Sequence, residues 1–277
     1  MIWRLIHYRP YSAFENMAID EAIFRETIRR QKPPTLRFFG WRPSAVSIGY
    51  FQDLTKEINV DRCRLSGVDI VRRMTGGKAV YHRDEVTYSL AAGKSGKLFP
   101  DHIVGTYEKI SLCLARGLSL LGIKAQLAKT NAGAPGGKPE MASACFSMPS
   151  GNELIVAGRK ICGSAQTRTQ GGFLQHGSLL LTFDPVETAA LILSPRAPEP
   201  SEELRRSVTA VNDIIPAPVS AEDLSMILQK GFIAELGISL SEEPLTPDEK
   251  ALSRQLVKKY ESDAWNRERK RTTGKSG

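Results

Sequence analysis

Three strand-like runs between Glu153 and Phe183 constrain the fold of this chain most. In the first part, ELIVAGRKI, a strand, an Ala157-Gly158 turn and a second strand follow one another, and LQHGSLLL supplies a third run. Short β-branched runs separated by turn residues are typical of neighbouring antiparallel strands. The middle of the chain therefore predicts an antiparallel or mixed sheet with helices on one side.

Further strands are expected in the first hundred residues. The runs TLRFFGW and SAVSIGY are apolar and bounded by Gly and Pro, and EVTYSLA alternates with a period of two. VDIVRRM and KAVYH flank Thr75, Gly76 and Gly77, which predicts a hairpin with the paired glycines at its turn.

Helices are marked by their capping residues. Ser12 and Glu15 form a capping-box signature that opens one helix, and Asp101 is expected to cap a second, which Gly122 stops. The residues after Pro185 read as mostly helical, with cap signals at Ser220 and at Thr246. These patterns predict an α+β fold with a small C-terminal helical cap. The expected division is a main domain at residues 1–248 (core about 33–248) and a C-terminal helix with a basic tail at residues 249–277.

Composition limits the class of protein. The 277 residues are 41% hydrophobic and 25% charged, which is typical of a globular protein. There is no apolar run near the roughly 20 residues that cross a bilayer and no signal-peptide core, so a cytoplasmic location without a membrane partner is expected. The four cysteines form no CxxC pair and there are four histidines, so neither a disulfide framework nor a metal site is predicted.

Positive charge is concentrated at the C-terminal end. Residues 258–277 hold seven basic and three acidic residues, which is half of the net charge of +8. Short basic tails are more often solvated than bound to nucleic acid, so nucleic acid is not the partner that we expect. The remaining positive charge favours association with acidic proteins.

Cys145 and Lys160 are the candidate catalytic residues. A thiol is a useful nucleophile as the thiolate, and a nearby ammonium lowers its pKa from about 8.5. The hairpin that carries Lys160 could return it toward Cys145, which ends a loop rich in Gly, Ala and Pro at residues 130–144; we expect this loop to be mobile and to cover bound substrate. The alternative is that Cys145 is a small loop hydrophobe and Lys160 a solvated strand residue.

The segment RRMTGGKAVYH, residues 72–82, is a second candidate site. Backbone amides of a glycine turn can hold an anion or a carbonyl oxygen, and arginines can hold phosphate. A Gly-Gly hairpin is often only a hairpin, and GxxxxGK[ST] is absent, so this is not a P-loop.

These segments together resemble the lipoate-protein ligase and octanoyltransferase family, which shares its catalytic fold with the biotin-protein ligases. The resemblance covers most of the chain. It rests on NMAIDEAI, GWRPSAVSIGYFQ, RRMTGGKAVYH, DEVTYSL, GRKICGSAQTR, LQHGSLLL and KKYESDAWN, in this order.

Two positions favour the octanoyltransferases of the LipM type over the ATP-dependent ligases. Cys145 lies fifteen residues before Lys160, as in that type, whereas ligases activate the acid as an adenylate and need no cysteine. DEVTYSL stands where ligases usually carry a Gly-Asn segment. The chain also has no room for the extra C-terminal domain of some ligases.

The resemblance implies a two-step acyl transfer without a cofactor, in a protein taken to be a monomer. Cys145 would take octanoyl from octanoyl-acyl carrier protein and pass it to a lysine of a lipoyl-accepting protein such as a glycine-cleavage H protein, while Lys160 favours the thiolate. For His82 and His176 we expect structural hydrogen bonds. The substrate-binding candidates are Arg72, Arg73, Thr75, Gly76, Gly77, His82, Gly163, Ser164, Ala165 and His176.

Three alternatives remain open at this point. An ATP-dependent lipoate-protein ligase would form AMP and would tolerate loss of Cys145. An octanoyl amidotransferase would use the same cysteine but take octanoyl from another lipoyl domain. A binding protein without catalysis would depend on the basic tail and on salt.

Overall fold

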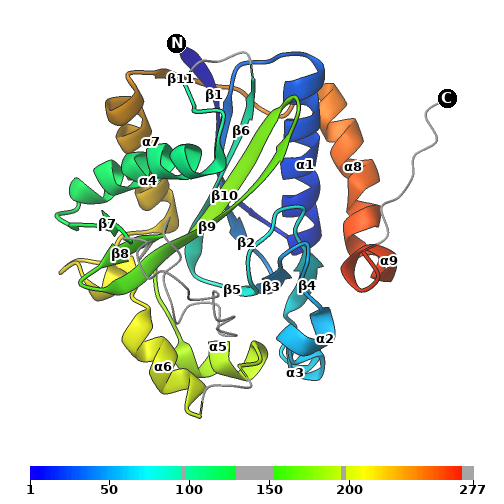
Figure 1. Cartoon of the computed structure of the whole chain (residues 1–277), viewed down its shortest axis with the longest axis vertical. Helices are drawn as coiled ribbons and strands as arrows, with labels where there is room; N and C mark the ends of the chain where they lie inside the picture. The colour runs from blue at the N-terminus through cyan, green and yellow to red at the C-terminus, as the bar shows by residue number, and fades with distance from the viewer. Residues whose placement is uncertain (95–97, 129–152, 195–197, 270–277) are drawn as a thin grey trace, which may run out of the picture.

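The computed structural model describes residues 1–94, 98–128, 153–194 and 198–269. Its principal feature is a mixed eight-stranded sheet in the order β11-β1-β2-β6-β10-β9-β8-β7, accompanied by a three-stranded sheet in the order β4-β3-β5 (Figure 1). The strands are β1 (Ile2–Tyr11), β2 (Thr35–Trp41), β3 (Ala45–Ile48), β4 (Asp69–Arg72), β5 (Val80–His82), β6 (Glu85–Gly93), β7 (Gln126–Leu127), β8 (Leu154–Val156), β9 (Arg159–Thr169), β10 (Gly172–Leu180) and β11 (Ser239–Glu242).

The helices begin at the residues that satisfy their free amides. The predicted capping boxes at Ser12 and Thr246 are both present, and Ser220 also caps its helix. The second predicted cap is wrong: the His102 side chain, not Asp101, accepts from Gly105 N. The helices are α1 (Ala13–Arg29), α2 (Leu54–Glu57), α3 (Val60–Leu65), α4 (Ile103–Ser119), α5 (Pro185–Leu191), α6 (Pro200–Ser207), η1 (Val211–Asp213), α7 (Ala221–Leu236), α8 (Pro247–Glu261) and α9 (Asp263–Asn266).

Helices cover both faces of the large sheet, which corrects the expectation that they lie on one side. Phe38 and Tyr88 face the layer of α4 and α7, whereas Ala91 and Leu174 face α1 (Figure 1). Strand β6 shows why the sequence was misleading, because all but the last of its residues are buried. The alternation in its sequence separates an apolar face from a more polar face. The polar face would be expected to meet solvent, but it is buried as well.

The predicted hairpin around Thr75 is also wrong. β4 and β5 do not pair with each other; both pair with β3, β4 in parallel and β5 antiparallel. The segment with Gly76 and Gly77 therefore crosses from one edge of the small sheet to the other. The predicted Ala157-Gly158 turn is confirmed, since both residues have positive φ and join β8 to β9 as a hairpin.

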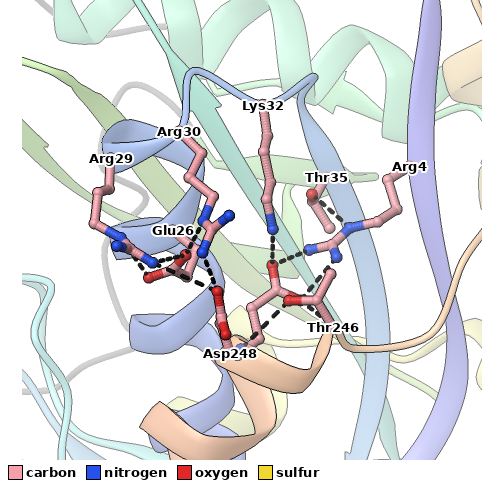
Figure 2. A network of polar contacts seen from close by, with 9 residues as sticks. Arg4, Glu26, Arg29, Arg30, Lys32, Thr35, Thr246 and Asp248 are labelled. Atoms are coloured by element: carbon pink, nitrogen blue, oxygen red, sulfur yellow. Dashed lines mark hydrogen bonds and ion pairs between the residues drawn. The ribbon is translucent and has the colours of Figure 1, made fainter.

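The C-terminal helix α8 packs along α1 and is fixed by polar contacts at its first turn (Figure 2). Arg4 donates two hydrogen bonds of 2.8 Å to the carboxylate of Glu249, and Lys32 reaches the same carboxylate at 3.3 Å. The Glu249 side chain is fully buried. Nearer the surface, Arg30 pairs with Asp248.

The end of α8 and the following helix α9 pack into the core. Tyr260 and Trp265 are buried in the cluster that contains Met17 of α1 and Phe39 of β2. The domain boundary expected at residue 248 stays a prediction. Within the described residues, none of the helices combines the length and the apolar character that crossing a bilayer requires.

Candidate active site

A cavity of about 280 Å³ lies where residues 73–79, which join β4 to β5 and are called the glycine segment below, meet strands β6, β9 and β10. Much of its wall is small or apolar, and residues with ionisable side chains also contribute to it: Arg73, Lys78, His82, Glu153, Lys160 and His176. The lining residues are Trp41, Arg73, Gly77, Lys78, Val80, His82, Thr87, Glu153, Lys160, Gly163, Ser164, Ala165, His176, Gly177 and Ser178.

Strand register brings part of this wall together. Ser178 of β10 lies opposite Thr87 of β6 on one side and opposite Gly163 of β9 on the other. Directly opposite residues in paired strands point to the same face of the sheet, so these three positions form one row across three strands. All three residues line the cavity.

Lys160 is buried at the wall, with 4% of the residue exposed, and its Nζ lies 2.5 Å from Oε1 of Glu153. The β8–β9 hairpin places it there, and Gly163 leaves room for it, because a Cβ at Gly163 would lie 2.9 Å from Lys160 Cε. Burial of an ammonium is costly unless an anionic partner lies beside it. Glu153 is that partner, and the sequence interpretation did not include it.

Cys145 and the loop expected at 130–144 lie outside the described residues. The three cysteines that the structure does describe, Cys63, Cys113 and Cys162, are all buried. Burial raises the pKa of Cys63 to about 11 and that of Cys162 to about 12, and it also raises the pKa of Cys113. None of these three is therefore suited to form a thiolate at neutral pH.

The glycine segment is held tightly behind the cavity. Gly77 has φ of +89°, and a Cβ at Gly49 would lie 1.9 Å from the Gly77 carbonyl oxygen, so both positions require glycine. Thr75 Oγ1 lies 2.7 Å from His176 Nε2. Gly77 and His176 line the cavity, whereas Thr75 and Gly76 do not.

The two predicted arginines have different surroundings. Arg73 lines the cavity and donates to the carbonyl oxygens of Gly76 and Lys78 at 3.1 and 2.9 Å. Arg72 is fully buried and does not line the cavity. Its guanidinium donates to backbone carbonyl oxygens, including those of Gly49 and Asn266.

His82 belongs to a buried polar cluster at the end of the cavity formed by β2 and β5. Its Nδ1 lies 2.8 Å from Oε1 of Glu85 and its Nε2 lies 2.5 Å from Ser47 Oγ, and its ring stacks on Trp41 at 4.0 Å between centroids. Burial raises the pKa of Glu85, but His82, Thr87 and hydrogen-bonded neighbours outweigh it and lower the pKa overall. His82 also lines the cavity, and the structural role expected for it stays a prediction.

His176 ends a second buried chain of contacts. Its Nδ1 lies 3.3 Å from Asp20, which accepts a 2.6 Å hydrogen bond from Arg37, and Arg37 also donates to Asn16 Oδ1 at 2.6 Å. Burial lowers the pKa of His176 despite the opposing effect of Asp20. The polar residues of NMAIDEAI thus contact and orient His176 from the face of the sheet that α1 covers.

Several lining residues were missed by the sequence interpretation, although most lie inside the segments that carried the resemblance. Trp41 belongs to GWRPS, Thr87 to DEVTYSL, and Gly177 and Ser178 to LQHGS. Lys78, Val80 and Glu153 complete the missed residues.

The described residues contain no cluster of three or more His, Cys, Asp or Glu side chains arranged to hold a metal ion.

Comparisons with known proteins agree with this fold. Residues 12–233 match the family model described as the lipoyl protein ligase A/B catalytic domain. The chain is 41% identical over 272 residues to a protein named octanoyltransferase LipM from Kyrpidia tusciae, covering 95% of this chain and 98% of the relative. A protein of the same name from Clostridioides difficile is 36% identical over 271 residues, covering 96% and 99%.

Solved structures resemble the chain over nearly its whole length. A lipoate-protein ligase A bound with ATP has a TM-score of 0.80 at 27% identity, covering 96% of this chain and 98% of that one. A bipartite lipoate protein ligase from Thermoplasma acidophilum, described together with its E2 lipoyl domain, has a TM-score of 0.81 at 25% identity, covering 99% of both chains. The fold and the family match agree, and the chain belongs to the lipoyl protein ligase A/B catalytic-domain family.

Proposed function

We propose that this protein is an octanoyltransferase of lipoate biosynthesis, which attaches octanoyl to a lysine of a lipoyl-accepting protein. The observation that carries the proposal is the match to relatives named octanoyltransferase over about 95% of the chain. The cavity supports it, because a buried lysine stands at a wall made largely of small residues.

The cavity suits a slender acyl chain. Its volume of about 280 Å³ lies just below the range of roughly 300–1,000 Å³ that is usual for small-molecule pockets. Gly77, Gly163, Ala165 and Gly177 contribute wall without long side chains. A linear eight-carbon chain can lie against such a wall, with Trp41 and Val80 as apolar contacts.

In the first step, the thiolate of Cys145 attacks the carbonyl carbon of the octanoyl thioester on acyl carrier protein. The new carbon–sulfur bond forms as the carrier thiolate leaves, so octanoyl is held on Cys145 as a thioester. The choice of Cys145 is supported by the burial of the three other cysteines. Neither this step nor the next one uses a cofactor.

Lys160 would act through its charge. The contact with Glu153 fixes the position of the Lys160 side chain, and a fixed ammonium favours the Cys145 thiolate and stabilises negative charge on the thioester oxygen. Such preorganised charge is more effective in a cavity than in water, because the dielectric response there is weaker.

In the second step, the neutral ε-amine of the acceptor lysine attacks the Cys145 thioester. The carbon–nitrogen bond forms, Cys145 leaves as thiolate, and the amine releases its extra proton to solvent. The acceptor is a lipoyl domain or a glycine-cleavage H protein. The Thermoplasma ligase described with its E2 lipoyl domain supports this class of acceptor.

An ATP-dependent ligase is the second candidate, favoured by the structural likeness to a lipoate-protein ligase A bound with ATP. The two reactions differ in their activated intermediate. A ligase forms an acyl-adenylate and releases AMP, whereas the transferase forms an acyl-cysteine.

Intact-mass measurement after mixing with octanoyl-acyl carrier protein without ATP tests the proposal. The expected result is an octanoyl adduct on the wild type that is absent from Cys145→Ala, with Cys162→Ala as the matched control that retains it. An adduct formed only from an octanoylated lipoyl domain would reassign the donor. Product formation that requires ATP and survives Cys145→Ala would replace the transferase with the ligase.

A further inference from the structure

The short helix α9 binds the strand that leads into the glycine segment. Arg72, the last residue of β4, donates its backbone N–H to Asn266 Oδ1 at 2.8 Å, and its carbonyl oxygen accepts from Trp265 Nε1 at 2.9 Å. β4 is the edge strand of the small sheet. Two side chains of α9 thus satisfy the backbone groups that another strand would otherwise pair.

The guanidinium of Arg72 extends this contact toward the cavity. It is fully buried and donates to the carbonyl oxygens of α9 at Trp265 and Asn266. It also donates to the carbonyl oxygens of Gly49, Tyr50 and Gln52 at 2.7–3.0 Å. One side chain therefore joins α9 to the loop of residues 49–52.

That loop and the glycine segment are in direct contact. Tyr50 N donates to Thr75 O at 2.8 Å, and Gly49 lies against the carbonyl of Gly77. On the other side Arg73 holds the carbonyls of the glycine segment, and Arg73, Gly77 and Lys78 line the cavity. An unbroken series of hydrogen bonds and close contacts connects α9 to the cavity wall.

α9 is itself well anchored. Trp265 is 3% exposed, and the ammonium of Lys259 lies 3.7 Å from the centre of its indole ring. Asn266 Nδ2 donates to Tyr260 O, and the Tyr260 hydroxyl donates to Glu21 of α1. The matched family domain ends at residue 233, so this anchor lies outside it.

We propose that Trp265 and Asn266 are positioning residues for the acyl pocket, acting through Arg72 on the cavity wall formed by Arg73, Gly77 and Lys78. This inference rests on the proposed octanoyl transfer and adds the C-terminal helices to its machinery. Loss of the α9 contacts would let the glycine segment shift, which loosens the fit to the eight-carbon chain before it affects the chemistry at the thioester.

The test compares Asn266→Ala and Trp265→Phe with Asp248→Ala, which weakens an exposed contact of α8 but none of α9. Steady-state transfer is measured from octanoyl, hexanoyl and decanoyl carrier protein under conditions in which all variants are folded. Asn266→Ala is expected to raise the KM for the octanoyl donor about tenfold and to reduce the preference for octanoyl by a similar factor. Trp265→Phe, which loses one hydrogen bond, is expected to raise KM roughly three- to tenfold, and Asp248→Ala to leave both quantities unchanged.

A purely structural role would give a different result. In that case Asn266→Ala would lower the melting temperature, while KM and chain-length preference of the folded enzyme would equal those of Asp248→Ala, and the proposal would be overturned.

Hydrogen exchange separates this proposal from the proposed function, because it needs no substrate. The Tyr50 and Arg73 amides donate to Thr75 O and Ile48 O, and both are expected to exchange faster in Asn266→Ala than in Asp248→Ala. If the wild type transfers no octanoyl, the function is wrong and this exchange still decides whether α9 positions the segment. Equal exchange in the two variants would contradict the positioning role.

Discussion

Two buried ion pairs in this protein have the same charges and different surroundings. Arg4 and Glu249 join β1 to α8, with exposed fractions of 6% and 0%, and the carboxylate also accepts from Lys32 and from the backbone at Thr246 (Figure 2). Lys160 and Glu153, at 5% and 12%, stand at the wall of a cavity.

The difference shows how to separate a structural pair from a functional one. Arginine holds its charge at any ordinary pH and binds a carboxylate with two parallel hydrogen bonds, which fixes one geometry. Lysine carries a compact charge on a flexible chain, and at a cavity wall that charge can act on a bound molecule. Burial alone does not distinguish the two pairs. The difference is that Lys160 and Glu153 line the cavity, whereas Arg4 and Glu249 do not.

Removal of the pocket ammonium should have the largest effect. Lys160→Ala is expected to slow octanoyl transfer by roughly 10²–10³-fold, because one preorganised donor to a developing oxyanion is worth about that much. Its loss of thermal stability should be smaller than that of Glu249→Ala, since the Glu153 side chain that is left, at 12%, is more exposed than that of Arg4, at 6%. Single-turnover transfer beside a melting curve measures both, and a large loss of stability with unchanged transfer would reverse the assignment.

Removal of the carboxylate at α8 should give the opposite profile. Glu249→Ala leaves Arg4 buried without its partner and is expected to lower the free energy of unfolding by about 3–5 kcal/mol. Urea unfolding measures this value. The double variant Arg4→Met with Glu249→Leu should recover much of the loss, because it removes both buried charges; no recovery would show that packing rather than charge is responsible.

The contribution of the Arg4–Glu249 pair to stability should depend on pH, because the pKa of the Glu249 carboxyl is shifted in the folded protein. Burial raises the pKa of Glu249, but Arg4, the Thr246 N–H and Lys32 outweigh it and hold the pKa below the ordinary 4.5. A lowered carboxyl pKa contributes stability that is present above 4.5 and is lost as pH falls through the folded value. The free energy of unfolding, measured between pH 7 and pH 3, should therefore fall more steeply with decreasing pH below about 4.5 in the wild type than in Glu249→Gln. The same dependence on pH in both proteins would show that the Glu249 carboxyl does not contribute to the acid sensitivity.

The exposed pair of the same helix should matter least. Asp248 and Arg30 are each about half exposed, and surface pairs contribute about 0–1 kcal/mol. Asp248→Ala is expected to shift the free energy of unfolding within that range, and 0.5 M salt should remove most of the shift. If Asp248→Ala lowered the free energy of unfolding as much as Glu249→Ala does, the position of a residue within the network, and not its burial, would determine how much it stabilises the protein.

Local signals predicted the parts of this fold that depend on local chemistry. The capping boxes at Ser12 and Thr246 are confirmed because each is complete within four residues, and the Ala157-Gly158 turn because two residues with positive φ suffice to join adjacent strands. The mixed sheet also followed, since its strands are strongly patterned.

Features that depend on distant partners could not be read in this way. The pairing of β4 and β5 with β3, instead of with each other, is decided by the small sheet as a whole. Arg72 and Arg73 are neighbours in one motif, yet Arg72 contacts α9, 194 residues later in the sequence, whereas Arg73 lines the cavity. Glu153 was missed because a single acidic residue has no pattern.

The position of β1 has a consequence for how the chain is made. β1 lies between β2 and β11 in the large sheet, and β11 is among the last strands to be synthesised. Arg4 meets Glu249 across 245 residues of sequence. During synthesis on the ribosome one edge of β1 therefore stays without its partner until most of the chain has emerged, and an open strand edge readily pairs with other chains. Yield in the cell should depend on protection of this first strand as much as on the stability of the finished molecule.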